Sequence, residues 1–296
     1  MARIRAFEEN LAAIYPRGLV RCPVHLAIGH EAAAVGVCEA LETRDLALGY
    51  HRSHHHYLAK GGDPRLLLLE LLGDPEGCSG GRGGSTHLKS EESGFLGSTA
   101  IIAGTLPVAS GVAHAEKLAA TGRVTVAFCG DAAIEEGVFL ETLNLARLWE
   151  LPLLVVVEDN DLSCYTPRSQ RQGFRDWASV AKLFGIEFRD ADGSDVGAVH
   201  AAASDLVHSV RSTSRPALLR IPVYRAHEHC GPDRDDALSY RAVEGQWPDR
   251  DPIERGLASL DSSSREQAAA MLREIRIEEA RWFASVLQEK ARGEGS

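Results

Sequence analysis

Two groups of polar residues follow two apolar runs in the stretch 124–160, "VTVAFCGDAAIEEGVFLETLNLARLWELPLLVVVEDN". Gly130 and Asp131 end the first run, and Asp159 and Asn160 end the second, with a helix-like segment between them. In a parallel sheet, ligands collect at the carboxyl ends of the strands, so crossover geometry would bring Asp131 and Asn160 side by side. Carboxylate and amide oxygens are hard ligands that suit a Mg²⁺ ion holding a phosphate. A helix that begins directly after Asp131 would also point its free amide groups at that phosphate. The simpler interpretation is a helix cap at Asp131 and a turn at Asp159 and Asn160, and other stretches must decide between the two.

Histidines are the second group of residues that could do chemistry. They gather in "HRSHHHY" (51–57) and in "YRAHEHCGPDRDD" (224–236). An ordinary imidazole titrates near neutral pH, so it can give or take a proton there. A single histidine in a polar loop is usually only solvated. The three consecutive histidines could also indicate metal binding, but no distant ligand set in the sequence accompanies them.

The elements that must position these residues follow from apolar periodicity. Each strand is expected to lead into a helix, which indicates one α/β domain over 1–258: a parallel sheet flanked by helices. A charged C-terminal helical extension over 259–296 should dock one face on this domain. The segment 45–52 should be a short strand that runs into a polar loop, and 73–87 is glycine-rich and irregular. The other expected strands are 124–129, 153–158, 186–189 and 217–224. The expected helices are 6–15, 30–42, 64–72, 104–120, 135–149, 176–184, 195–210 and 263–291.

Composition limits the class of protein. The chain has 296 residues, a net charge of −10 and 44% hydrophobic residues, which is typical of a soluble globular protein. The acidic balance argues against a nucleic-acid partner, because polyanions are bound by clustered Lys and Arg. No apolar run approaches the length of a membrane span, and the N-terminus lacks the apolar core of a signal peptide. The six cysteines form no C-x-x-C pair, so zinc spacing is absent and a cytoplasmic location is expected.

The spacing of the two polar groups resembles the thiamin-diphosphate motif, which reads Gly-Asp-Gly, an interval, and Asn-Asn. Here the motif reads Gly130-Asp131-Ala132 and Asp159-Asn160, and Asp131 precedes Asn160 by 160 − 131 = 29 residues. More closely, residues 6–258 resemble the alpha chain of the decarboxylating component of 2-oxo acid dehydrogenase complexes of the pyruvate, acetoin and branched-chain types. The matching segments are "GLVRCPVHLAIGHEAAAVGV", "HRSHHHYLAKGGDP", "CSGGRGGSTHL", "LPLLVVVEDN", "DGSDV", "YRAHEHCGPDRDD" and "RDPIERG".

The resemblance implies two cofactors, thiamin diphosphate and Mg²⁺, and a residue set for each. Mg²⁺ would be bound by the side chains of Asp131 and Asn160 and by the backbone carbonyl of Leu162. Arg52 would pair with the terminal phosphate, and His51 could touch it as well. The backbone at Gly130, Ala132 and Ala133 would approach the diphosphate.

The resemblance also assigns residues to the rest of the cofactor and to proton transfer. Ala100 and Ile102 match backbone positions that face the aminopyrimidine ring, and the Ile102 side chain would force the cofactor to bend. His229 matches a loop histidine at the cofactor that handles protons during acyl transfer to lipoamide. His54 matches a second catalytic histidine, which faces the substrate.

The resemblance implies partners and leaves alternatives open. The glutamate that starts the chemistry lies on a separate beta chain in this family, so a heterotetramer of two alpha and two beta chains is expected. A small 2-oxo acid is the expected substrate, and a lipoyl-bearing acyltransferase is an allowed partner. A carboligase or transferase without lipoamide remains an alternative, because "EDNDLSCYTPRSQRQ" departs from the family's usual Asn-Asn-Gly-Tyr. Ala132 in place of the motif glycine is a small change that requires a permissible φ. A non-catalytic assembly chain is the third hypothesis, and the presence of Arg52, Asp131 and Asn160 argues against it.

Overall fold

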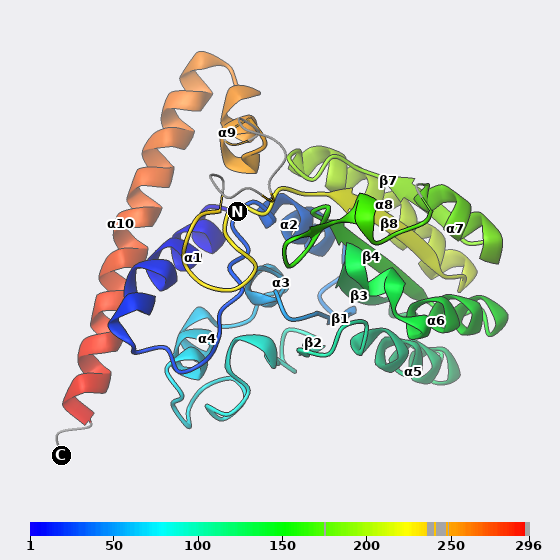
Figure 1. Cartoon of the computed structure of the whole chain (residues 1–296), viewed down its shortest axis with the longest axis horizontal. Coiled ribbons are helices and arrows are strands. Elements are labelled where there is room, and N and C mark those ends of the chain that lie inside the picture. Colours follow the sequence, from blue (N-terminus) through cyan, green and yellow to red (C-terminus); the bar gives the residue numbers. More distant parts are fainter. Residues whose placement is uncertain (175, 236–239, 241–246, 248, 294–296) are drawn as a thin grey trace.

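A six-stranded parallel sheet lies at the centre of the molecule, with the strand order β2-β1-β3-β4-β8-β7 (Figure 1). The structure is a computed structural model, and it describes residues 1–174, 176–235, 240, 247 and 249–293. The strands are β1 (Leu46–Leu48), β2 (Phe95–Gly97), β3 (Thr125–Gly130), β4 (Leu153–Asp159), β7 (Glu187–Asp190) and β8 (Ala217–Pro222). The parallel α/β sheet predicted from the sequence is confirmed.

The two central strands are buried on both faces of the sheet. Val126 and Phe128 of β3 belong to one apolar core, whereas Ala127 and Cys129 belong to the other. Successive side chains of a strand point to opposite faces, so both cores draw on the same strand. This double burial explains why β3 and β4 are continuous apolar runs and do not alternate with polar residues.

Helices cover both faces of the sheet (Figure 1). The core on one face combines α1 (Ala2–Ile14), α2 (Glu31–Glu39), α3 (His54–Ala59), α4 (Pro64–Leu71) and α8 (Val196–Thr213). The core on the other face combines α5 (Thr105–Leu118), α6 (Gly137–Leu148) and α7 (Trp177–Phe184). Short 3-10 turns connect these elements: η1 (Tyr15–Arg17), η2 (Gly84–Thr86), η3 (Asp131–Glu135) and η4 (Arg168–Gln170).

Aspartates fix the starts of four helices. Asp63, Asp176, Asp195 and Asp251 each precede a helix, and each side chain accepts a hydrogen bond from an amide of its first turn. Those amides have no partner inside the helix, so each aspartate supplies the missing acceptor. Local sequence therefore sets where α4, α7, α8 and α9 (Pro252–Ala258) begin.

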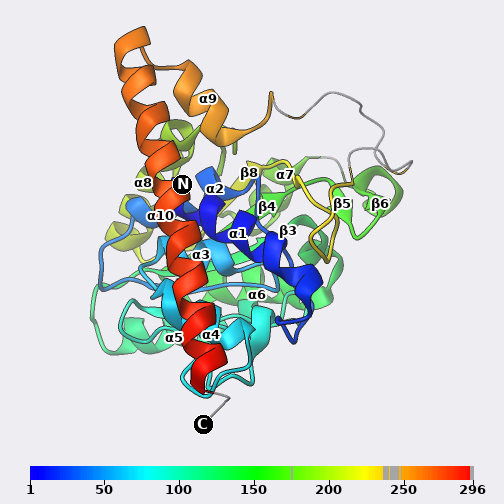
Figure 2. The same cartoon turned by 90° about the vertical axis from the view of Figure 1, so that its left-hand side faces the viewer.

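The C-terminal segment forms one long helix, α10 (Ser262–Gly293), which runs past α1 towards α4 (Figure 2). Phe283 and Val286 of this helix are buried in the core, and the Phe283 ring lies 5.0 Å from that of Phe7. The predicted helix over 263–291 is thus confirmed, while the division at residue 258 remains a prediction. In the described residues, no helix has both the length and the apolar character that crossing a bilayer requires.

The segment after β1 differs from the prediction. A strand over 45–52 and a polar loop were expected, but β1 ends at Leu48 and the chain enters α3 at His54. His54, His55 and His56 are fully buried. A polar loop was expected at these histidines, and here they are inside because a buried carboxylate contacts one ring nitrogen of each: Glu8 for His54, and Glu158 for His55 and His56.

Three further features were missed or displaced in the sequence reading. The strand β2 and the hairpin of β5 (Leu162–Ser163) and β6 (Thr166–Pro167) are only two or three residues long, too short for a periodic pattern. The helix expected directly after Asp131 begins only at Gly137. Residues 131–135 form the 3-10 turn η3, and Glu136 is extended, with φ −85° and ψ 129°, so it separates this turn from α6.

The glycine-rich segment 73–87 is irregular apart from η2, as predicted, and it wraps around one carboxylate. Glu70 of α4 is buried and accepts hydrogen bonds from four backbone amides, those of Ser79, Gly81, Gly83 and Gly84. These bonds satisfy the buried charge and fix the path of the loop. The loop then delivers Ser85 to the side chain of His54.

Candidate active site at the carboxyl edge of the sheet

The predicted site residues follow five neighbouring strands on the same edge of the sheet. Because all six strands are parallel, their carboxyl ends share one edge, where loops and helix starts converge. Residues Ala100 and Ile102 follow β2, His51 and Arg52 follow β1, Asp131 follows β3, Asn160 follows β4, and His229 follows β8. The fold thus brings segments that are far apart in sequence to one edge.

Arg52 is a buried cation with no carboxylate partner among the described residues. Its guanidinium donates to the backbone carbonyls of Leu26 and His229, the latter at 3.1 Å. Burial lowers its pKa to about 10, so it stays charged at neutral pH. A buried charge normally requires a counter-ion, and a planar guanidinium suits a phosphate. Arg52 therefore fits the expected contact with a terminal phosphate.

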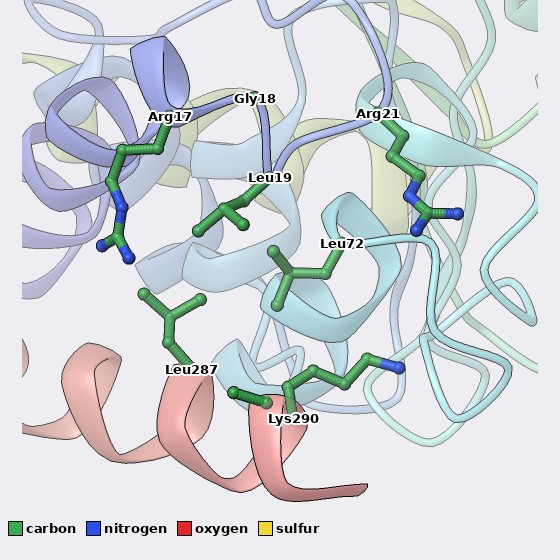
Figure 3. A pocket seen from close by; sticks show the side chains of 8 residues that line it. Arg17, Gly18, Leu19, Arg21, Leu72, Leu287 and Lys290 are labelled. Carbon is green, nitrogen blue, oxygen red and sulfur yellow. The ribbon is translucent and has the colours of Figure 1, made fainter. Parts of the chain in front are cut away.

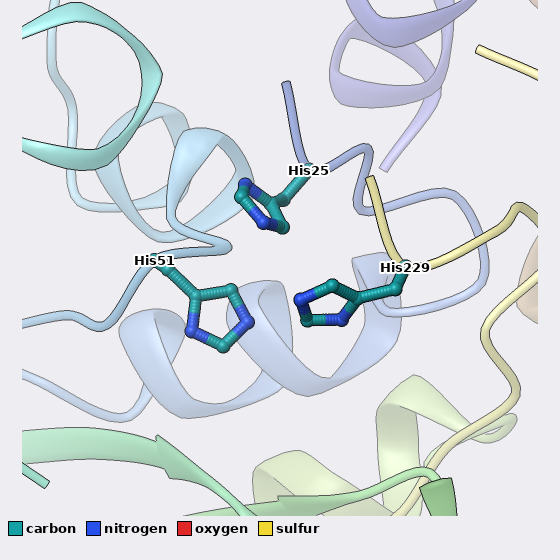
Figure 4. A group of neighbouring side chains, drawn as sticks. All are labelled: His25, His51 and His229. Carbon is teal, nitrogen blue, oxygen red and sulfur yellow. The ribbon is translucent and has the colours of Figure 1, made fainter. Parts of the chain in front are cut away.

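His51 lies in a cluster with His229 and with His25, a residue that the sequence reading did not single out. Ring centroids are 4.8 Å apart for His25 and His51, 4.9 Å for His25 and His229, and 5.3 Å for His51 and His229 (Figure 4). Burial, helped by the positive charge of Arg52, lowers the pKa of all three: to about 3 for His25, about 2 for His51 and about 4 for His229. The three imidazoles are therefore neutral at neutral pH.

His54 does not lie on the open edge with these histidines. Its side chain is fully buried, Nδ1 contacts the Glu8 carboxylate at 3.1 Å, and Nε2 lies 2.7 Å from the Ser85 hydroxyl. Both ring nitrogens are thus engaged by protein groups. Its carboxylate and hydroxyl partners hold His54 inside, and its role towards the substrate remains a prediction.

Asp131 is buried and already paired in this structure. Arg171 donates to Asp131 Oδ2 at 2.6 Å, and the Gln172 side chain donates to the Asp131 carbonyl at 3.0 Å. Burial raises the pKa of Asp131 to about 7, the charge of Asp159 adds to this effect, and Arg171 opposes it. The carboxylate is in place for a cation, but Arg171 must leave Oδ2 if a metal ion is to use it.

Asn160 and Leu162 lie close to the turn that carries Asp131. Asn160 Oδ1 accepts a hydrogen bond of 3.0 Å from the Leu162 amide, and β5 packs against η3. Carboxylate, amide and carbonyl oxygens from these residues form the donor set that Mg²⁺ prefers. The residues present therefore fit a magnesium ion at this position.

The backbone beside Asp131 leaves room for a ligand. A Cβ atom added to Gly130 would meet only the Tyr50 ring, at 3.9 Å. Ala132 and Ala133 lie in η3 with negative φ, so the methyl group that replaces the motif glycine causes no backbone strain. The departure from Gly-Asp-Gly is therefore compatible with the fold.

An apolar hollow of about 400 Å³ opens beside the segment that carries Ala100 and Ile102. Its lining includes Leu48, Leu96, Ile101 and Val108. Ile101 and Val108 are more than half exposed, and Ile102 is 40% exposed. This edge of the sheet thus offers an open apolar surface next to the polar site.

Sequence reasoning also missed Glu158, the buried centre of a hydrogen-bond network below the site. Its carboxylate lies within 3.1 Å of ring nitrogens of His30, His55 and His56, and it accepts from the Tyr50 hydroxyl. The signal in the sequence was a charged residue at the end of an all-apolar strand. The partners of that residue become evident only from the register of β1, β3 and β4.

A second hollow, of about 200 Å³, lies between α4, α10 and the turn after α1 (Figure 3). Its walls include the basic side chains Arg17, Arg21 and Lys290 and the apolar side chains Leu72 and Leu287. None of these residues follows a strand, and Lys290 is paired with Asp74. This hollow is therefore separate from the site at the sheet edge.

Comparison with known proteins gives concordant results. The model of a protein family described as "Dehydrogenase E1 component" matches residues 1–290. The chain is 37% identical over 243 residues to the alpha subunit of acetoin:2,6-dichlorophenolindophenol oxidoreductase from Cupriavidus necator, an alignment that covers 82% of this chain and 72% of that protein. It is 35% identical over 260 residues to the pyruvate dehydrogenase E1 component subunit alpha from Rhizobium meliloti, covering 88% and 75%. It is also 35% identical over 244 residues to the alpha subunit of acetoin:2,6-dichlorophenolindophenol oxidoreductase from Bacillus subtilis, an alignment that covers 82% of this chain and 72% of that protein.

Proposed function

The chain belongs to the dehydrogenase E1 component family, and we therefore propose that it is the alpha subunit of a decarboxylating 2-oxo acid dehydrogenase. This family depends on thiamin diphosphate, and its relatives include alpha subunits of pyruvate and acetoin enzymes. In our proposal the enzyme acts on a small 2-oxo acid of this type and passes the acyl group to a lipoyl-bearing acyltransferase. A cytoplasmic location is part of the proposal, because all six cysteines are free, as is usual in reducing compartments.

One observation carries the proposal: five strand ends bring to one edge a buried arginine that has no carboxylate partner among the described residues, a buried carboxylate and neutral histidines. Bound thiamin diphosphate would supply the nucleophilic carbon and the electron sink for loss of CO₂. Arg52 would hold the terminal phosphate through its planar fork. Asp131, Asn160 and the Leu162 carbonyl would hold Mg²⁺, once Arg171 leaves Asp131.

The remaining residues would shape and serve the cofactor. Gly130, Ala132 and Ala133 would let the diphosphate approach the backbone. Ala100 and Ile102 would face the aminopyrimidine. His51 would lie against the phosphate beside Arg52, and a ring nitrogen of His229, neutral at neutral pH, would accept a proton near the mouth of the site.

The apolar surface around Ile101, Ile102 and Val108 supports the need for a partner chain. Exposed apolar side chains beside a polar site are costly in water unless another subunit covers them. We propose that a beta subunit covers this surface, supplies the glutamate that activates the cofactor, and completes a heterotetramer of two alpha and two beta chains. The cofactor would then lie between the subunits.

Co-expression with a family beta chain tests this proposal. The purified alpha chain alone should not turn over 2-oxo acids, whereas the complex should decarboxylate one of them with an artificial electron acceptor. Adding a lipoyl domain should allow acyl transfer. Decarboxylation by a partner-free alpha chain would refute the shared site, and activity that never reaches lipoyl domains would refute the proposed acyl acceptor.

A further inference from the structure

We propose that His25, His51 and His229 form a binding site for a divalent transition-metal ion such as Zn²⁺. The site is distinct from the oxygen-rich magnesium site at Asp131. Each histidine offers one ring nitrogen, and these three ligand atoms lie within 4.8 Å of one another (Figure 4). Neutral imidazole is a preferred ligand of Zn²⁺, Cu²⁺ and Ni²⁺, whereas Mg²⁺ takes oxygen ligands.

The backbones that carry the three histidines are tied to one another. The Gly231 amide donates to the Val24 carbonyl at 2.9 Å, which joins the loop of His229 to the segment of His25. Arg52, the neighbour of His51, donates to the His229 carbonyl at 3.1 Å. The fold therefore holds the three side chains together before any ion binds, which lowers the ordering cost of binding.

The three rings are close enough for tetrahedral binding after small side-chain rotations. Zn–N bonds of about 2.0–2.1 Å place tetrahedral ligand atoms roughly 3.4 Å apart. All three side chains are partly exposed, so an ion and a water ligand can reach them. In the described part of the chain His25 Nδ1 is buried without a hydrogen-bond partner, so no protein group competes for it.

The protonation state of the histidines favours metal binding at this site, whereas the charge of nearby residues opposes it. The histidines are already neutral at neutral pH, so no proton must leave before an ion binds. The nearby cations Arg52 and Arg225 repel a second positive charge, which weakens the affinity. An anion bound at Arg52 should therefore strengthen metal binding.

Calorimetric titration of the chelator-treated full chain with ZnCl₂ tests the site. One ion should bind per chain, and His25→Gln should weaken that binding at least about tenfold, since it removes one of three ligands. Two matched controls separate this site from others. His208→Gln changes an exposed histidine on α8, and Asp131→Ala removes the main magnesium ligand; both should leave the Zn²⁺ affinity unchanged.

Co²⁺ gives a second readout that depends on geometry. Bound by three imidazoles it should show the visible absorption of a tetrahedral ion, and this spectrum should be lost in His25→Gln and also in His229→Gln. Circular dichroism must show that the variants are folded. Unchanged Zn²⁺ affinity in a folded His25→Gln variant would overturn the proposal, as would loss of binding in Asp131→Ala alone. The titrations are made without thiamin diphosphate, because an anion at Arg52 would change the metal affinity, and cofactor binding is measured separately.

Discussion

The Tyr50 hydroxyl donates a hydrogen bond of 2.6 Å to the Glu158 carboxylate, and this bond joins the segment after β1 to the end of β4. His30, His55 and His56 reach the same carboxylate. Burial alone would raise the pKa of Glu158, but the surrounding histidines lower it well below its usual range. The ionised carboxylate therefore fixes the chain that leads to His51 and Arg52.

Replacing Glu158 by Gln should destabilise the fold. The change leaves several buried donors without a charged acceptor, which costs about 2–4 kcal/mol in the free energy of unfolding. Glu187→Gln is the matched control, because Glu187 is a partly exposed strand glutamate that pairs with Arg189, and it should cost less than about 1 kcal/mol. Urea denaturation measures the free energy of unfolding of both variants. Equal losses would mean that the Glu158 network does not support the fold.

Arg52→Ala should weaken binding of thiamin diphosphate about 10- to 100-fold, the value of a charge-assisted hydrogen bond in a buried site. Affinity for thiamin, which lacks the diphosphate, should change little. Arg44→Ala, an exposed arginine paired with Glu42, serves as the control and should affect neither ligand. Calorimetry on the assembled enzyme measures both affinities. Equal losses for both ligands would show that Arg52 does not contact the phosphate.

Arg171→Ala should increase the apparent Mg²⁺ affinity of cofactor binding. Arg171 occupies Asp131 Oδ2, so a metal ion must displace it, and its removal lowers that cost. The assay belongs near pH 8, because burial raises the pKa of Asp131 to about 7 and only the carboxylate binds the ion. Arg168→Ala is the control, because it removes an arginine from Asp159 and leaves the contact of Arg171 with Asp131 in place; Arg220 still pairs with Asp159. Asp131→Ala should abolish the Mg²⁺ dependence, and undiminished binding there would contradict the assignment.

The positions of Asp131 and Asn160 could be predicted from the sequence for a physical reason. Each follows a continuous apolar run, and parallel strands place their ends on one edge whatever their loops do. The same reasoning applies to Arg52 and His229, which the family resemblance identified. The positions of side chains at strand ends depend mainly on the strands being parallel, and the alternation of strands and helices in the sequence indicates a parallel sheet.

The partners of these residues could not be predicted, because they depend on register and on loop conformation. His25 meets His229 because a backbone hydrogen bond joins two distant loops, and Arg171 reaches Asp131 through the η4 turn. The surroundings of His54 could not be predicted for a related reason. Its environment is set by Glu8 on α1 and by Ser85 in the glycine-rich loop, neither of which is near it in sequence.

Acid should destabilise the protein partly through His55. Burial lowers the pKa of this side chain to about 3, against the opposing charge of Glu158 and with help from His56 and His30. The unfolded chain therefore binds a proton between pH about 6.5 and 3 that the folded chain does not, so stability falls as the pH drops through that range. His55→Gln should make this decline shallower by up to about 1.4 kcal/mol per pH unit. His208→Gln, an exposed histidine, should leave the slope unchanged.

We predict that replacing His229 will affect acyl transfer more than decarboxylation. Burial and the charges of Arg52 and Arg225 lower its pKa to about 4, so the free subunit holds it as a proton acceptor. A diphosphate bound at Arg52 would offset that positive charge and raise the pKa again, which would let His229 donate a proton to a dithiolane sulfur. His229→Ala should therefore reduce lipoyl acylation by about 10²-fold or more, the usual contribution of one general acid. Decarboxylation followed with an artificial acceptor should fall much less.

His227→Ala is the control on the same loop. The His227 ring contacts the Pro232 carbonyl at 2.7 Å, so this substitution should affect neither assay strongly. A His229→Ala variant impaired equally in both assays would place this histidine in the earlier chemistry.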